Sequence, residues 1–134
     1  MIMLRRLPRP AAGWGPVLAV AMAVVLGGCA EGHVAEPAPV VQGGDPERGQ
    51  TAILGYGCVS CHVIPGLPEA DARVGPDLDG LATRRIIAGQ HPNRPEVLVR
   101  WLQNPQEMRP GSGMPDMGVS EQDARDIAAY LYSR

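Results

Sequence analysis

The C-terminal part of the chain carries the clearest pattern of hydrophobic and polar positions. Ser120 can cap a helix there, with Asp123 at the third position. The apolar residues that follow have the i, i+3, i+4, i+7 spacing of one buried helical face: Ala124, Ile127, Ala128 and Leu131. This spacing predicts a last helix that begins at Ser120 and packs through this stripe.

An earlier segment has the signals of a helix start. Asp45 can cap a helix, and Pro46 suits its first turn. This helix should run to about Gly55. Its inward-facing residues are expected to be Ala52, Ile53 and Tyr56.

A third helix is predicted in the second half of the chain. Asn93 and Glu96 have the spacing of a capping box, with Pro95 in the first turn, and the pair Asn104-Pro105 ends the helix. Its apolar face comprises Val97, Leu98, Trp101 and Leu102.

The segments between these helices are punctuated by Pro and Gly. Residues 65–80 should be mostly loop, with a short helix near Asp77 to Arg84. Residues 106–118 should form a second loop, which holds Met108, Met114 and Met117. No segment has a convincing strand pattern and no internal repeat is present, so the pattern favours one helical domain.

Residues 1–28 have the pattern of a bacterial lipoprotein signal peptide. Three arginines precede an apolar run that is short for a membrane span, which needs about 20 apolar residues. Leu26-Gly27-Gly28-Cys29 matches the lipobox, which predicts that Cys29 is lipidated and becomes the N-terminus. An ordinary signal peptide and an uncleaved anchor are the alternatives. All three place the rest of the chain outside the cytoplasm, on the periplasmic or extracytoplasmic side of a bacterial membrane.

The composition divides the chain after the signal peptide into two parts, a tether and a domain. Residues 30–44 are rich in Ala, Pro, Gly and Val without periodicity, so residues 29–44 are expected to be a lipidated N-terminus and a flexible tether. Residues 45–134 form the predicted domain, which has no Phe and one Trp. A core this poor in large side chains points to a cofactor as an additional stabilising element.

The net charge of the exported part limits the kinds of partner that it can bind. All twelve basic residues are arginines, three of them lie in the first 28 residues, and none of the fourteen acidic residues does, which leaves a formal net charge of −5 from residue 29 onward. An acidic surface argues against nucleic acid as a partner and against a basic patch for anionic lipid.

Cys58-Val59-Ser60-Cys61-His62 is a C-x-x-C-H motif, the signature of covalent c-type haem attachment. Two cysteines three positions apart on a helical turn present both sulfurs to the same side, where they can add to the haem vinyl groups, and His62 then points toward the iron. A redox dithiol would require a βαβ context and a zinc site a second Cys or His pair, and neither is evident. An accidental match is the remaining alternative.

A thioether is the expected sixth ligand, because a His/Met pair raises the reduction potential. Met114 is the first candidate, since the small residues and prolines around it (PGSGMP) make a constrained loop that can approach a porphyrin face. Met117 is the second candidate, and Met108 is expected to pack in the core.

Five motifs, in order, resemble those of class I cytochromes c over residues 45–134. They are GCVSCH (57–62), VGPDLDGL (74–81), RWLQNP (100–105), PGSGMP (110–115) and DIAAYL (126–131). The resemblance is strongest to the cytochrome c domain attached to subunit II of some haem–copper (caa3-type) oxidases. It implies an all-α, class I cytochrome c fold with about four short helices around one covalently bound haem c. It also implies that the first and last helices cross near Gly49, Ile53 and Tyr130, and that Met114 is the distal ligand.

The same resemblance suggests further roles in cofactor binding. The Pro76 carbonyl would accept a hydrogen bond from His62 Nδ1, which would fix the ring. Trp101 would direct its indole N–H at a haem propionate, with Arg84 or Arg85 as further partners. Plain core packing for Trp101, and a solvated face for the two arginines, are the alternatives.

These observations predict a monomeric, free-standing lipoprotein that carries single electrons rather than transforming a small-molecule substrate. Its partners would be redox proteins: a quinol-oxidising complex or dehydrogenase as donor, and a terminal oxidase as acceptor. One alternative is a dedicated redox subunit of a periplasmic dehydrogenase. Another is a haem-based ligand sensor or peroxidase, if Met114 is not a stable ligand of the iron.

Overall fold

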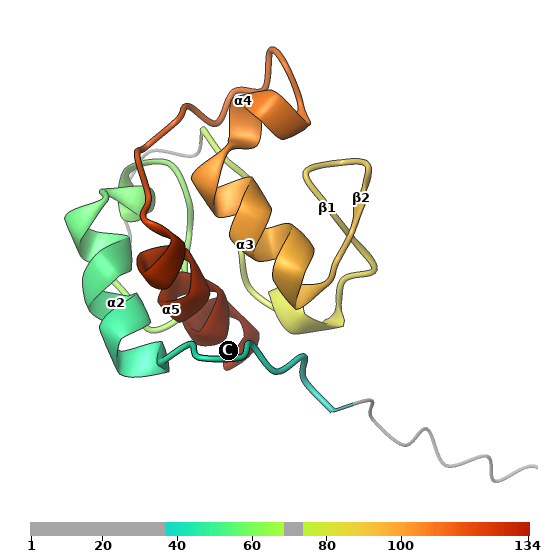
Figure 1. The fold of residues 1–134 in the computed structure, drawn as a ribbon. Coiled ribbons are helices and arrows are strands. Elements are labelled where there is room, and N and C mark those ends of the chain that lie inside the picture. The colour runs from blue at the N-terminus through green and yellow to red at the C-terminus, as the bar shows by residue number, and fades with distance from the viewer. Residues whose placement is uncertain (1–36, 69–73) are drawn as a thin grey trace, which may run out of the picture. The chain divides into compact units, whose positions relative to one another are not determined.

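The computed structural model describes residues 37–68 and 74–134. The predicted signal peptide, Cys29 and the tether up to residue 36 lie outside the described residues, as do residues 69–73 of the first long loop. The described part contains four α-helices and very little strand (Figure 1), which confirms the predicted all-α class. None of the described helices has the length and apolar character needed to cross a bilayer.

Helix α2 (Pro46–Gly55) begins as predicted. Asp45 Oδ1 accepts hydrogen bonds from the backbone N–H groups of Glu47 and Arg48 at 2.9 and 3.0 Å, and so satisfies two donors that a helix start leaves free. The helix ends at the expected place. Ile53 is fully buried, while Ala52 and Tyr56 are partly buried against the core.

Helix α5 (Glu121–Tyr132) also matches its prediction. Ser120 caps it by accepting from Asp123 N at 3.1 Å, and all four residues of the predicted apolar stripe are buried. Tyr130 and Tyr132 are buried as well, which the stripe alone did not indicate.

Helices α2 and α5 lie side by side and cross at a glycine (Figure 1). A methyl group at Gly49 would overlap the Asp126 carbonyl and come within 3.0 Å of Tyr130 Cβ. Gly49 therefore lets the two backbones approach closely, and the crossing predicted near Gly49, Ile53 and Tyr130 is present.

Helix α3 (Pro95–Gln103) carries Leu98, Val99 and Leu102 into the core, but its predicted cap was wrong. The capping position is Arg94, which makes no side-chain cap bond. Asn93 instead donates from Nδ2 to the carbonyls of Leu81 and Arg84, at 2.7 and 2.8 Å, and accepts at Oδ1 from the Tyr132 hydroxyl. The Asn93 amide is therefore used to join a loop to α5.

Four short elements, η2, β1, β2 and α4, differ from what the pattern predicts. The helix expected near Asp77 to Arg84 is a single 3₁₀ turn, η2 (Leu81–Thr83), because Gly80 before it has a left-handed φ of +63°. Two-residue strands β1 (Ile86–Ile87) and β2 (His91–Pro92) pair antiparallel, although no strand was predicted. The second loop begins with a short helix, α4 (Pro105–Met108), whose first-turn proline follows the predicted stop at Asn104.

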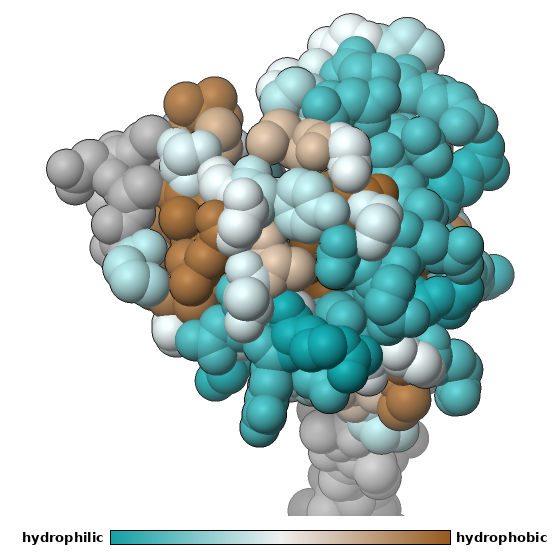
Figure 2. Space-filling model, turned by 60° about the vertical axis from the view of Figure 1, so that its left-hand side comes forward, coloured by the Kyte–Doolittle hydropathy of each residue, from teal (hydrophilic) through white to brown (hydrophobic). Residues whose placement is uncertain are grey.

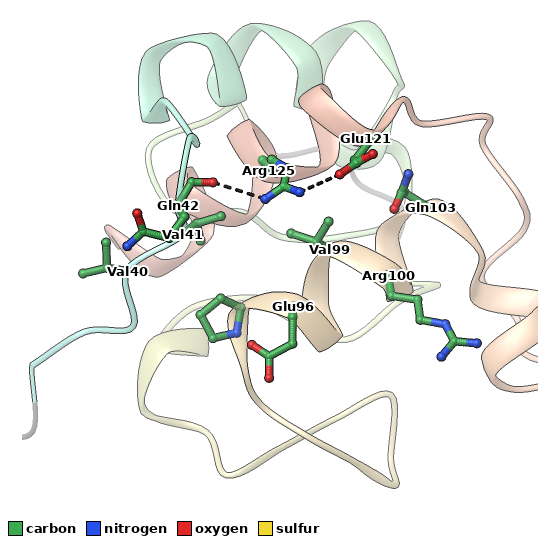
Figure 3. A pocket seen from close by; sticks show the side chains of 10 residues that line it. Val40, Val41, Gln42, Glu96, Val99, Arg100, Gln103, Glu121 and Arg125 are labelled. Carbon is green, nitrogen blue, oxygen red and sulfur yellow. Dashed lines mark hydrogen bonds and ion pairs between the residues drawn. The ribbon is translucent and has the colours of Figure 1, made fainter.

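The residues before Asp45 are attached to α5 rather than free. Val41 is buried, the Gln42 carbonyl accepts from Arg125 at 3.3 Å, and the Gly43 carbonyl accepts from Gln122 at 2.9 Å. Figure 3 shows the Arg125 bond at the edge of a hollow of about 450 Å³ between this segment, α3 and α5. The ordered domain therefore includes residues 41–44, which the composition had placed in the tether.

Candidate haem site

The cysteine pair lies on a tight turn directly after α2. Gly57 has a left-handed φ of +71°, which ends the helix and starts the 3₁₀ turn η1 (Cys58–Ser60). The N–H groups of Cys61 and His62 both donate to the Cys58 carbonyl, at 3.2 and 3.0 Å. Both thiols are free and partly buried, and burial raises the pKa of the Cys58 thiol. This one turn therefore brings Cys58, Cys61 and His62 together.

The His62 ring is fixed from one side by the next loop. Its Nδ1 lies 2.7 Å from the Pro76 carbonyl oxygen, the bond that the resemblance implied. Because a carbonyl can only accept, Nδ1 is the donor of this bond, and in the neutral ring the lone pair is then on Nε2. The histidine is thus held in the tautomer that a metal ligand needs.

Gly75 makes this arrangement possible, although it was not singled out from the sequence. A Cβ at Gly75 would lie 2.6 Å from His62 Nδ1 and 2.9 Å from Nε2, so any side chain there would displace the ring. Gly75 N also donates to the Cys61 carbonyl at 2.8 Å. The backbone of the Gly75-Pro76 segment is therefore packed directly against the histidine. The signal in the sequence was the Gly-Pro pair within the VGPDLDGL motif, which does not by itself indicate contact with a histidine.

Arg84 supports the loop that carries Pro76. Its Nη2 donates to the carbonyls of Asp77 and Asp79, both at 2.7 Å. Arg85 is exposed. For both arginines a contact with haem propionates stays a prediction.

The three methionines of the second loop differ in their surroundings. Met114 is partly buried and packs against the hydrophobic core, Met117 is 41 % exposed, and Met108 is half-buried on α4. Gln106 Nε2 donates to the Met114 carbonyl at 2.6 Å, a contact that the sequence did not reveal. Met114 is therefore the methionine whose loop is held against the interior.

A tyrosine joins the cysteine segment to the end of the methionine loop. Tyr56 OH donates to Asp123 Oδ2 at 2.8 Å and accepts from Ser120 N at 3.3 Å. Tyr56 precedes the Cys58 turn, and Ser120 follows the Met114 loop. The start of α5 therefore fixes both segments relative to each other.

Trp101 is partly buried against the core, and its ring lies 6.4 Å from that of His91, with the two planes tilted by 41°. Its predicted hydrogen bond to a propionate is not tested by this geometry.

The residues present have the chemistry that a covalently bound haem requires. The donor set consists of two free thiols, an imidazole whose Nδ1 is bonded to the Pro76 carbonyl, and a thioether. Several apolar side chains pack on the core while remaining only partly buried, as a surface that receives a flat apolar group would: Val59, Leu78, Ala82, Val97 and Trp101. In Figure 2, apolar surface gathers on one side of the face shown, while hydrophilic surface covers most of the other side.

This helical fold, with a fixed histidine beside two thiols, defines a haem protein of the c type. A sequence model of the cytochrome c family matches residues 46–134, so the chain belongs to the cytochrome c family. It is accordingly an electron-transfer haem protein with one covalently bound haem c.

Three curated relatives are oxidase subunits. The chain is 35% identical over 77 residues to cytochrome c oxidase subunit 2 of Alkalihalophilus pseudofirmus, covering 57% of this chain and 22% of that protein. It is 30% identical over 99 residues to the same subunit of Bacillus sp. strain PS3, covering 71% and 28%. For Bacillus subtilis the identity is 28% over 88 residues, covering 64% and 25%. The chain thus spans about a quarter of the length of these relatives.

A solved structure shows the same fold. Cytochrome c2 from Rhodobacter sphaeroides superposes with a TM-score of 0.54 at 24% identity, covering 67% of this chain and 95% of that one. The fold expected from the motifs is thereby confirmed.

Proposed function

We propose that this protein is a membrane-tethered, monohaem c-type cytochrome that carries single electrons in a respiratory chain to a terminal oxidase. The observation that carries the proposal is the His62–Pro76 bond beside the two free thiols, since this bond orients the histidine ring as a ligand for haem iron. The oxidase-subunit relatives support the choice of acceptor.

In this proposal each residue has one role toward the haem. Cys58 and Cys61 would hold it through thioether bonds, and His62 Nε2 and the Met114 sulfur would be the two protein ligands of its iron. Trp101 would donate its indole N–H to a propionate, and Arg84 or Arg85 would supply positive charge there. When bound, haem c supplies a one-electron Fe(III)/Fe(II) couple.

Ligand saturation favours electron transfer over catalysis. With His62 and Met114 both bound, the metal has no open position for oxygen or a substrate, and catalysis at a metal needs one. The chain's own contribution is a rigid, largely apolar surround, made by the core residues and by the bonds to Pro76 and within the Met114 loop. Little rearrangement then accompanies a change of charge.

Attachment to the membrane follows from Cys29. A lipid on this residue and the segment up to residue 40 would hold the monomer on the extracytoplasmic side of the membrane. Tethering raises the local concentration near membrane-bound partners, which suits the weak, small interfaces of redox encounters.

The test is electron delivery in vesicles. The mature lipidated protein, kept reduced by an excess of ascorbate and placed with a haem–copper oxidase of its host in one vesicle membrane, should support oxygen uptake as the only protein donor. A Cys29→Ser form should need about tenfold or more higher concentration for the same rate, because it loses the tether but keeps the domain. If the reduced protein supports no oxygen uptake with any such oxidase of the host, the proposed acceptor is wrong.

A further inference from the structure

Gln106 lies in the first turn of α4, and its side chain reaches into the loop that carries Met114. Its Nε2 donates to the carbonyls of Ser112 and Met114, at 2.8 and 2.6 Å, and its Oε1 accepts from Gly111 N at 3.2 Å. One partly buried amide therefore closes the loop at three backbone positions.

The rest of the loop has little else to hold it in place. Gly111, with a φ of +79°, and Gly113 are exposed, and a Cβ at either would meet no atom within 4 Å. The local bonds are short-range: Met114 N donates to Ser112 Oγ at 3.2 Å, and Ser112 N donates to the Arg109 carbonyl at 3.1 Å. Gln106 thus ties the Met114 backbone to a helix.

We propose that Gln106 is a positioning residue for Met114. By holding the loop closed, it keeps the thioether where it can reach the iron and sets how often the sixth position opens to an outside ligand. The proposal rests on the proposed function, in which Met114 is the sixth ligand.

The physical argument is a two-state equilibrium of the loop. An added ligand such as imidazole binds iron only when Met114 has left, so its apparent affinity is proportional to the open fraction. One intramolecular hydrogen bond makes only a modest net contribution to stability. Removing all three bonds of the Gln106 side chain should nevertheless raise the ratio of open to closed loop by about ten- to a hundredfold.

The experiment compares ferric holoproteins by imidazole titration in the haem absorption band. Gln106→Leu removes all three bonds. Gln106→Glu keeps the acceptor for Gly111 N but cannot donate to the two carbonyls at neutral pH. Gln103→Leu is the matched control, because Gln103 lies in the hollow of Figure 3 and the same apolar replacement is made there.

Both Gln106 variants should bind imidazole at least tenfold more tightly than the unaltered protein, and they should lose more of the weak sulfur–iron charge-transfer absorption at a given imidazole concentration. The Gln103 control should stay within twofold. Thermal unfolding is followed in parallel, since a merely structural role would lower the melting temperature without changing the imidazole affinity of the folded protein.

An increase of less than threefold in both Gln106 variants overturns the positioning role. Met114→Ala separates this failure from that of the proposed ligand. If Met114→Ala abolishes the charge-transfer absorption while the Gln106 variants behave as the unaltered protein, the role of Gln106 alone is wrong. If Met114→Ala leaves that absorption intact, Met114 is not the sixth ligand, and the positioning role of Gln106 is wrong as well.

Discussion

At the scale of single residues, Asp126 is the fully buried charged side chain in the described part of the chain, with 1 % exposure. It accepts from Asp45 N, from Arg48 Nε and Nη2, and from Gln122 Nε2, at 2.8 to 3.0 Å. Burial by itself would raise the pKa of Asp126, but the bonds from Arg48, Asp45 and Gln122 and the charge of Arg48 outweigh it, so the pKa is lowered. The carboxylate thus joins α2 to α5 in its ionised form.

Asp126→Asn should lower the free energy of unfolding of the holoprotein by about 2 kcal/mol at neutral pH, because bonds to a charged acceptor are lost. Since the folded pKa lies below the unfolded value of about 3.9, the advantage of Asp126 is present above that pH and disappears as pH falls through the folded pKa. Urea unfolding at several pH values measures this.

Glu121→Gln is the control for that substitution. Glu121 lies on the same helix and pairs with Arg125, but its side chain is 66% exposed. The change should cost less than about 1 kcal/mol. If Asp126→Asn lowers the free energy of unfolding no more than Glu121→Gln does, the Asp126 carboxylate does not stabilise the contact between α2 and α5.

The proposed ligand can also be tested one residue at a time. Met114→Ala should abolish the sulfur–iron charge-transfer absorption of the ferric protein, because the loop held against the core would present no sulfur. Met117→Ala should preserve it, since Met117 is exposed. The reverse outcome would assign the sixth position to Met117.

At the scale of elements, the crossing of α2 and α5 requires the two backbones to approach closely at Gly49. Gly49→Ala should destabilise the protein by about 1–3 kcal/mol, since the new methyl would meet the Asp126 carbonyl and push the helices apart. The gain in helix propensity of about 1 kcal/mol from Gly to Ala acts in the opposite direction.

Gly55→Ala gives the matched comparison in the same helix. A Cβ at Gly55 meets no atom within 4 Å, so this change should be neutral or stabilise by up to about 1 kcal/mol. Thermal unfolding of both holoproteins measures the difference. Equal effects at the two glycines would mean that close approach does not determine the crossing.

The elements also show what sequence patterns can predict. Caps made by a neighbouring side chain, as at Asp45 and Ser120, and a regular apolar stripe are local features, and both predictions were correct. The Asn93 cap was wrong because its amide has three partners distant in sequence, on two other segments. A local pattern contains no information about such partners.

The candidate site divides in the same way. The C-x-x-C-H motif defines its own turn, and the family motifs indicated the His62–Pro76 bond correctly. Gln106 and Gly75 were missed for a common reason: each acts through backbone or ring atoms that only the folded chain brings near.

At the scale of the whole molecule, the described domain has a core of small and medium side chains, with Tyr130 and Tyr132 as its buried aromatics and no Phe. Several apolar residues at its edge are only partly covered. For a small domain with so modest a core, we expect an additional apolar group to contribute much of the stability.

The Cys58→Ala, Cys61→Ala double variant, made without haem, should therefore be largely unfolded at 25 °C. Far-ultraviolet circular dichroism and a thermal melt measure this, with the holoprotein as the reference. A cooperative melt of the haem-free variant, with helical content equal to that of the holoprotein, would show that the polypeptide core is sufficient for folding without haem.

The attachment of residues 41–44 to α5 decides where the domain can be cut and joined. A fusion protein or an electrode-immobilised form that begins at Asp45 would lack the carbonyls that Arg125 and Gln122 bind. Val40 is 73 % exposed, so an artificial linker can join there without disturbing those bonds. Anyone grafting this electron carrier onto a different anchor should therefore place the junction before Val41.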